Sequence, residues 1–295
     1  MEWIAFPLVG LIISVLSGFF GVGGGFILTP FLLLIGFSPV EAIMVSLLFS
    51  IATSVMGAFA HLRQKNIRWK MSVILGVSGV LATQVAQPFV MFLSKRGLDE
   101  VVIPLLYIIL LLYFAWKMKQ ETKREVAATA ENERKNQEIK NVLAKTIFIG
   151  IAGGFVSTTL GVGGGFLMVP LLITLLGFQA RQAVGTSLMS VLFIVIAGFI
   201  TYALKTPFDY SNALLLIVGA LVGSPIGAKL TKYYLHQETA KWLSYLYIAI
   251  MGSVVLKLFK VPLWGLVVMA VFISLFAASI VKKIMNKRKR MVSNS

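Results

Sequence analysis

Long apolar segments recur along the whole chain, and short polar or charged stretches separate them. Segments such as Val101–Trp116 and Ala213–Val222 contain no charged residue at all. Apolar segments of about 18 residues or more with few charges are typical of helices that cross a bilayer. The pattern therefore predicts an all-α polytopic membrane protein.

Two of the apolar runs are too short to cross a membrane. The expected full spans are Trp3–Phe20, Glu41–Ala60, Met71–Leu93, Val101–Trp116, Thr146–Leu160, Gln182–Leu204, Ala213–Leu230, Trp242–Leu258 and Val261–Val281. The short runs, Phe26–Gly36 and Phe166–Gly177, each follow a glycine-rich break. A helix of about eleven residues rises only about 16 Å, roughly half of a ~30 Å hydrocarbon core. We expect these runs to be half-helices or re-entrant arms.

The two glycine-rich breaks belong to a longer internal repeat. The stretch GVGGGFILTPFLLLIGFSPVEAIMVSLL (Gly21–Leu48) aligns with GVGGGFLMVPLLITLLGFQARQAVGTSL (Gly161–Leu188) after one extra residue in the second copy. Glycines and prolines match at the same offsets, which chance similarity between apolar segments would not preserve. A duplication explains this best.

The charged residues indicate how the segments are oriented. The chain has 27 Lys and Arg against 11 Asp and Glu, a net charge of +16. The basic residues gather in His61–Lys70, in Lys117–Lys145 and in Lys282–Arg290, beside apolar segments, where the positive-inside rule expects them. This placement argues against nucleic acid as a partner. It favours a multi-pass protein of the cell membrane with its N-terminus outside and its C-terminus cytoplasmic.

With that orientation, the two halves of the chain have opposite directions in the membrane. The sequence thus predicts two inverted-topology repeats whose glycine-broken half-helices meet near the bilayer midplane. The expected parts are a first repeat (1–117), a charged cytoplasmic linker (118–145), a second repeat (146–260), an extra transmembrane helix (261–281) and a basic cytoplasmic tail (282–295). The first segment is expected to be retained in the membrane, because Glu2 stands where a signal peptide would be basic and no Ala-x-Ala site follows.

The glycine runs suggest a binding site for an anion. They fit no nucleotide motif, because Phe26 and Phe166 stand where GxGxxG needs glycine and no Lys-Ser/Thr follows. Three successive glycines weaken a helix, and a break within a membrane must be buried in protein or line a wet cavity. The first amides of the following half-helix have no acceptor within the helix and could bind an anion. Close packing of helices is the alternative explanation.

The polar residues expected within the membrane are mostly uncharged hydroxyls and amides, which can donate hydrogen bonds to an anion. They are Ser46, Ser50, Thr53, Gln84, Gln87, Ser157, Thr158, Thr159, Thr186, Ser187, Ser190 and Ser224. Ser46 and Ser187 correspond under the repeat. The candidate substrate-binding residues are Gly23, Gly24, Gly25, Gly163, Gly164, Gly165, Ser46, Thr186, Ser187 and Gln84.

No catalytic arrangement or metal site emerges from the sequence. The chain has two histidines and no cysteine, and it shows no Ser/His/Asp set and no paired carboxylates. We expect no enzyme activity, no cofactor and no metal. Glu41 is expected to stabilise the start of a helix. The expected partners are a small anionic substrate and the lipid bilayer, and a homodimer remains open.

At these residues the sequence resembles the TauE/SafE family, also called the sulfite exporter or TSUP family. The resemblance rests on GVGGG-F-x-x-x-P in both halves (Gly21–Pro30 and Gly161–Pro170), supported by Ala183–Leu188 and Gly219–Leu230. It implies secondary transport of sulfur-containing anions or small organic acids such as sulfite or sulfonates, and it favours export. The halves differ where Ala82–Gln87 replaces the Gly-x-Pro-x-Gly of the second half, so Gln84 and Gln87 could influence substrate choice.

Taken together, the sequence predicts a transporter that works by alternating access, with the anion held by the two GVGGG loops. Two alternatives stay open, an anion-selective channel and a transporter of non-sulfur organic acids. Broken helices and backbone donors suit a channel equally well. The sequence does not identify the anion or a coupling ion.

Overall fold

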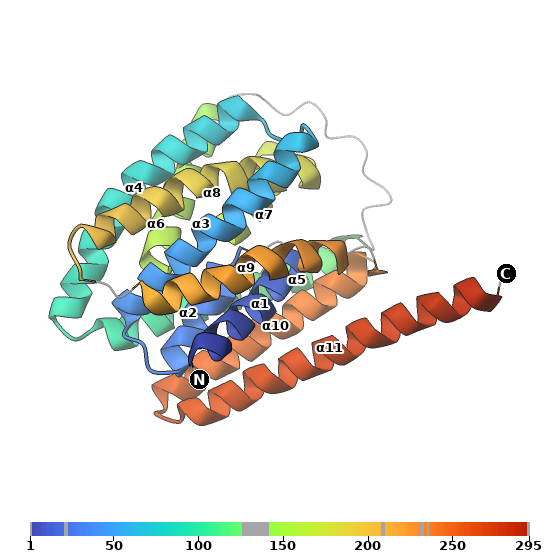
Figure 1. The fold of residues 1–295 in the computed structure, drawn as a ribbon. Coiled ribbons are helices and arrows are strands. Elements are labelled where there is room, and N and C mark those ends of the chain that lie inside the picture. Colours follow the sequence, from blue (N-terminus) through green and yellow to red (C-terminus); the bar gives the residue numbers. More distant parts are fainter. Residues whose placement is uncertain are drawn as a thin grey trace. The chain divides into compact units, whose positions relative to one another are not determined.

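The computed structural model describes residues 2–20, 23–125, 142–207, 210–230, 233–234 and 236–293. Its regular elements in these ranges are helices (Figure 1). They are α1 (Glu2–Phe20), α2 (Gly25–Leu34), α3 (Pro39–Arg63), α4 (Trp69–Lys95), α5 (Asp99–Glu125), α6 (Val142–Leu160), α7 (Gly165–Leu176), α8 (Ala180–Ala203), α9 (Ser211–Leu230), α10 (His236–Leu258) and α11 (Pro262–Ser293).

The prediction of an all-α polytopic membrane protein is confirmed. Among the described residues, 8 helices are long and apolar enough to cross a membrane. The short runs form α2 and α7, of 10 and 12 residues. The helices extend into the expected linker from both sides, since α5 continues to Glu125 and α6 begins at Val142. The remainder of the linker lies outside the described residues.

Contacts divide the chain into two units. The first contains residues 1–103 and 136–228, and the second contains residues 104–135 and 229–295. The first unit therefore holds α1 to α4 and α6 to α9, including both glycine breaks.

In the first unit, polar contacts set the register between α4 and α8. The backbone N–H of Arg68 donates to Thr186 Oγ1 at 3.1 Å, and Ser190 Oγ donates to the Ser72 carbonyl oxygen at 3.1 Å. Lys205 Nζ, just beyond α8, donates to Gln87 Oε1 at 3.1 Å. All three pairs are 118 residues apart. A constant spacing means that α4 and α8 run parallel along their whole length.

Glycines allow two other parallel pairs of helices to approach closely. A Cβ on Gly154 of α6 would overlap the Gly79 backbone of α4, and one on Gly150 would meet Leu75. In the same way, Gly10 of α1 faces Leu216 of α9, and Gly18 faces Ser224. Such approach lets backbones touch in a membrane, where the hydrophobic effect does not drive helices together.

The central helices α3 and α8 run antiparallel and make reciprocal contacts. Gly57 lies against Leu188, and Gly198 lies against Leu47. Residues 47 and 57 correspond to residues 188 and 198 in the sequence repeat, so each half makes the same contact to the other. Because α4 runs parallel to α8, α3 is also antiparallel to α4.

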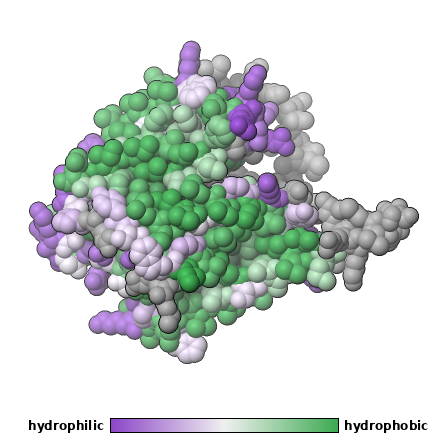
Figure 2. Space-filling view, viewed as in Figure 1, coloured by the Kyte–Doolittle hydropathy of each residue, from purple (hydrophilic) through white to green (hydrophobic). Residues whose placement is uncertain are grey.

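The outer faces of the long helices are apolar. On α4, Val73, Val77, Leu81 and Val85 recur every four residues and are between 50% and 65% exposed. Figure 2 shows hydrophobic residues over most of the visible face of the helices. An exposed apolar stripe at helical spacing is typical of contact with lipid.

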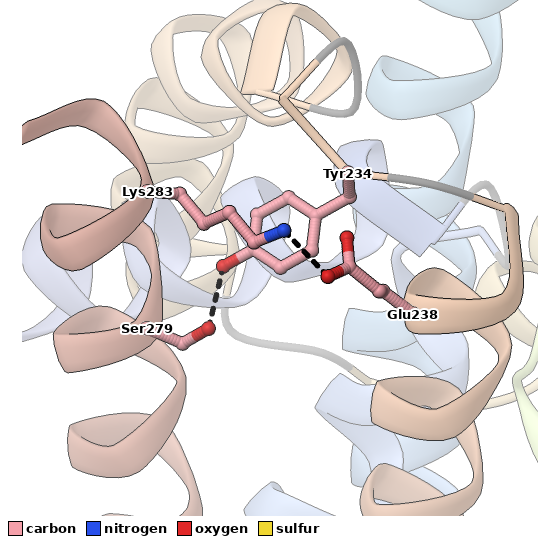
Figure 3. A network of polar contacts seen from close by, with 4 residues as sticks. All are labelled: Tyr234, Glu238, Ser279 and Lys283. Atoms are coloured by element: carbon pink, nitrogen blue, oxygen red, sulfur yellow. Dashed lines mark hydrogen bonds and ion pairs between the residues drawn. The ribbon is translucent and has the colours of Figure 1, made fainter. Parts of the chain in front are cut away.

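The second unit is held together by α10 and α11. Trp242 of α10 packs edge-on against Phe276 of α11, with ring centroids 5.3 Å apart. Figure 3 shows a polar network beside it, in which Lys283 pairs with Glu238 and Tyr234 Oη shares a hydrogen bond of 2.8 Å with Ser279 Oγ. The network joins the beginning of α10 to the distal part of α11.

A capping box at the start of α3 follows the short connection from α2. Ser38 Oγ accepts from the backbone N–H of Glu41, and the Glu41 carboxylate accepts from the backbone N–H of Ser38. This capping box satisfies two amides that the start of a helix leaves free. The predicted role of Glu41 in stabilising a helix N-terminus is confirmed.

Candidate functional site: two glycine loops between half-helices

The backbone explains why the chain has glycine at the two breaks. In the second glycine loop (Gly161–Gly165), Gly161, Gly163 and Gly164 have φ of 71°, 74° and 69°. Of the first glycine loop the structure describes Gly23–Gly25, and Gly23 has φ of 84°. Side chains other than glycine rarely adopt this left-handed region. The glycine runs therefore interrupt the helices and let α2 and α7 begin immediately afterwards.

The two glycine loops lie against each other. A Cβ on Gly25 would overlap the carbonyl oxygen of Gly161, and one on Gly23 would lie 3.6 Å from the carbonyl oxygen of Val162. The rings of Phe26 and Phe166, one residue into each half-helix, have centroids 4.8 Å apart. The starts of α2 and α7 thus meet in one place, although 140 residues of sequence separate Gly25 from Gly165.

The second glycine loop folds back against α6. Gly164 lies against the backbone of Gly153 and against Ser157, and four residues further along α7 Met168 also lies against Gly153. The start of α7 therefore packs against α6 several residues before the end of that helix. The sequence left open whether this segment crosses the membrane or returns, and that stays open.

Ser50 of α3 contacts both glycine loops. Its hydroxyl oxygen accepts a hydrogen bond of 3.0 Å from the backbone N–H of Gly25. The same oxygen lies 3.2 Å from the position of a Cβ on Gly163. Because this oxygen already accepts from Gly25, the Ser50 hydroxyl proton is free to donate elsewhere, and no acceptor for it occurs among the described residues. Ser50 is 1% exposed and lies near the middle of α3.

Several buried hydroxyls near the loops have no hydrogen-bond partner in the described structure. They are those of Ser46, Ser157, Thr158 and Thr159. Ser46 precedes Ser50 by one helical turn, and Ser157–Thr159 form the end of α6 directly before the second glycine loop. All four side chains are at most 1% exposed. Buried hydroxyls normally find a partner, so a group of unpartnered ones indicates a place for a ligand or water.

The first amides of the half-helices are partly used within the protein. That of Gly25 donates to Ser50, and that of Gly165 donates to the Gly163 carbonyl oxygen at 2.9 Å. The buried hydroxyls described above are therefore further donors beside the loops. Within the ranges given above, no group of three His, Cys, Asp or Glu residues could hold a metal ion.

The structure brings most of the predicted site residues together. Gly23–Gly25 and Gly163–Gly165 form the paired loops, and Ser46 lies one turn from Ser50. Ser187 lies one turn before Val191, whose methyl groups are 3.7 Å from the Cβ positions of Gly163 and Gly165. The Ser187 hydroxyl donates to the carbonyl oxygen of Val184 at 3.1 Å. Ser50 and Val191 correspond under the repeat, so the two halves place different chemistry against the loops.

Two predicted residues have other contacts. Thr186 Oγ1 accepts from the Arg68 backbone at the start of α4, and so satisfies an amide of that helix. Gln84 is exposed beside the apolar stripe of α4, and its Nε2 donates to Thr83 Oγ1 at 3.2 Å. Neither of these hydrogen bonds involves a glycine loop.

Sequence reasoning did not rank Ser50, Ser157, Thr158 and Thr159 among the site residues, although it noted them as polar. The run of three hydroxyl residues directly before GVGGG was the available signal for the last three. Ser50 had a weaker signal, its spacing of four residues after Ser46 on the expected helix.

Comparison with known proteins points to membrane transport. The chain is 29% identical to the probable membrane transporter protein YjnA of Bacillus subtilis over 76% of this chain and 88% of the relative. It is 27% identical to YdhB of the same organism, which bears the same description, over 76% and 88%. A probable membrane transporter protein of Methanocaldococcus jannaschii is 26% identical over 76% and 85%.

These relatives are named as transporters, which agrees with a protein that is not an enzyme. No solved structure matches the chain significantly. The model of the sulfite exporter family TauE/SafE matches residues 6–258. The chain is thus a multi-pass membrane protein that belongs to the TauE/SafE sulfite exporter family.

Proposed function

We propose that this protein is a secondary transporter, working as an exporter, for small sulfur-containing anions such as sulfite or sulfonates. The anion would bind between the two glycine loops. The observation that carries the proposal is the meeting of these loops beside buried hydroxyls that lack a partner. Family membership supports transport and the class of substrate.

The chemistry around the loops suits an oxyanion. Ser50, Ser157, Thr158 and Thr159 can each donate one hydrogen bond, and the dipoles of α2 and α7 place their positive ends at the loops. No Lys or Arg occurs in Gly23–Leu34 or in Ser157–Leu176. A site built from neutral donors can bind an anion and release it again, because no buried cation holds it.

The arrangement of the helices supports alternating access. The reciprocal contacts of α3 and α8 are those expected if the two halves are related by a two-fold axis in the membrane plane. We propose that the halves rock about this central pair while the anion stays at the loops. Ser50 and Val191 lie near the middle of α3 and α8, which fits a site near the bilayer midplane.

An experiment with purified protein in liposomes tests this function. Liposomes loaded with radiolabelled sulfite should release it with saturating kinetics, and external sulfite should stimulate exchange. Ser50→Ala and Ser157→Ala should each reduce the flux by about tenfold or more, since a lost hydrogen bond to a charged group costs about 1.5–3 kcal/mol.

Ser274→Ala serves as the matched control, because Ser274 is on α11 and donates to Ala270 of its own helix. It should leave the flux unchanged. Currents far above carrier rates would instead indicate an anion channel. Exchange of carboxylates without any exchange of sulfite or sulfonates would point to an organic acid transporter and reject the proposed substrate.

A further inference from the structure

A second polar cluster lies apart from the glycine loops, where α4 meets the connection after α8. Lys205 Nζ donates to Gln87 Oε1 at 3.1 Å. Gln87 is 1% exposed, and its Nε2 has no hydrogen-bond partner in the described structure. Thr206 Oγ1, on the next residue after Lys205, is likewise buried and unpartnered.

The contact to Lys205 determines how the Gln87 amide is oriented. An ammonium can only donate hydrogen bonds, so it holds the amide oxygen toward itself. The amide nitrogen then has two N–H groups without an acceptor, and two N–H groups of the ammonium also remain. No carboxylate pairs with Lys205 within the ranges that the structure describes, and Asp209 lies outside them.

The cluster therefore presents donors and a positive charge without an acceptor. A buried amide is rarely left unpaired, so an acceptor is expected beside it. Because the amide and the ammonium offer several N–H groups together, a group that accepts several hydrogen bonds at once would suit the cluster. A small oxyanion has this property, and it would bridge the amide nitrogen and the ammonium by charge-assisted hydrogen bonds. Lys205 itself is exposed, so the cluster is open on the side of the ammonium, and the positive charge there favours an anion over water as the partner of the buried amide.

We propose that Lys205 and Gln87 form a second binding site, which takes a small oxyanion. The register of α4 and α8 builds this site, because the spacing of 118 residues that pairs Ser72 with Ser190 also places Lys205 opposite Gln87. Two sources provide the ligand chemistry, a free oxyanion or the phosphate of a lipid headgroup. The site stands independently of the transport function proposed above.

The test measures binding of radiolabelled thiosulfate and phosphate to the purified full-length protein, in detergent and in phospholipid nanodiscs. Lys205→Met should lower the affinity for the anion at one class of sites about tenfold or more, since it removes a charge-assisted hydrogen bond. The matched control is Lys95→Met, which removes the same charge at an exposed position near the end of α4 and should leave binding unchanged.

Gln87→Glu separates ligand binding from a structural role. It keeps the shape of the side chain and gives Lys205 a carboxylate partner, so the Tm should be no lower than in the wild type. It also removes the N–H donors and repels an oxyanion, so the same class of binding should be lost. A purely structural contact would leave anion binding intact in this variant.

Each outcome decides for or against the site. Loss of the same class of binding in Lys205→Met and Gln87→Glu supports it. Binding seen in detergent and absent in phospholipid nanodiscs assigns the site to a lipid phosphate. Unchanged binding in both variants, or no binding of either anion by the wild type, overturns the proposal. A normal sulfite flux in Ser50→Ala would count against the site at the glycine loops and would not affect the site at Lys205 and Gln87.

Discussion

At the residue scale, the contact between Gly25 and Gly161 leaves no room for a single methyl group. Most glycines of the two loops are required, for two different reasons. Gly161, Gly163 and Gly164 need positive φ, whereas Gly24 has an ordinary helical backbone with φ of −65°. What excludes a side chain at Gly24 is the ring of Phe49.

Gly25→Ala should lower the thermal stability of the protein. The added methyl group would overlap the carbonyl oxygen of Gly161, which is backbone and cannot rotate away. Overpacking of this kind typically costs about 1–3 kcal/mol. Thermal unfolding of the purified variant measures the change.

The control for this substitution is Gly252→Ala in α10, where nothing lies within 4 Å of the added Cβ. At that position alanine should leave the Tm unchanged or raise it, because glycine within a helix lowers the folding stability by about 0.5–1 kcal/mol relative to alanine. Equal Tm values for the two variants would contradict the close contact of the loops.

At the element scale, close helix contacts at glycines and the register between α4 and α8 position the half-helices. Gly150 and Gly154 bring α6 against α4, and α6 in turn holds α7 through Gly153 and Ser157. The second glycine loop is thus held against α6 and, through α6, against α4.

Gly154→Leu should prevent stable folding, because the leucine would overlap the backbone of α4 at Gly79. The yield of monodisperse protein in size-exclusion chromatography is the measurement. Ile151→Leu on the same helix is the control, since Ile151 is 47% exposed and should accept the change. A normal yield of Gly154→Leu would show that α4 and α6 can separate.

At the scale of the whole molecule, the inverted topology of the repeats stays a prediction, and it can be tested directly. The chain has no cysteine, so any introduced cysteine is the sole thiol. Ile35, between α2 and α3, and Gln179, between α7 and α8, are exposed and lie near corresponding points of the two repeats.

Ile35→Cys should react with a membrane-impermeant thiol reagent added to intact cells, and Gln179→Cys should react only after permeabilisation. Labelling is read by a mass shift of the purified protein. Both positions labelled from the same side would refute inverted repeats, and the opposite pattern would reverse the expected orientation of the termini.

The outcomes at individual residues show how far sequence reasoning reached. It identified the glycine breaks, the short helices after them and the capping role of Glu41, because each depends on neighbouring residues. It did not separate Ser50, which contacts both loops, from Thr186, which caps α4. Both are hydroxyls on apolar helices, and their local patterns are alike.

The amino-acid sequence by itself determined that this protein is a helical membrane protein with two related halves, each broken by glycines. Helix length, apolarity, flanking charge and the conformational freedom of glycine are local properties, so they can be read along the chain. Only the tertiary structure decided which donors surround the loops and that Lys205 reaches Gln87. Those contacts join residues far apart in sequence, and they depend on the direction, register and rotation of packed helices.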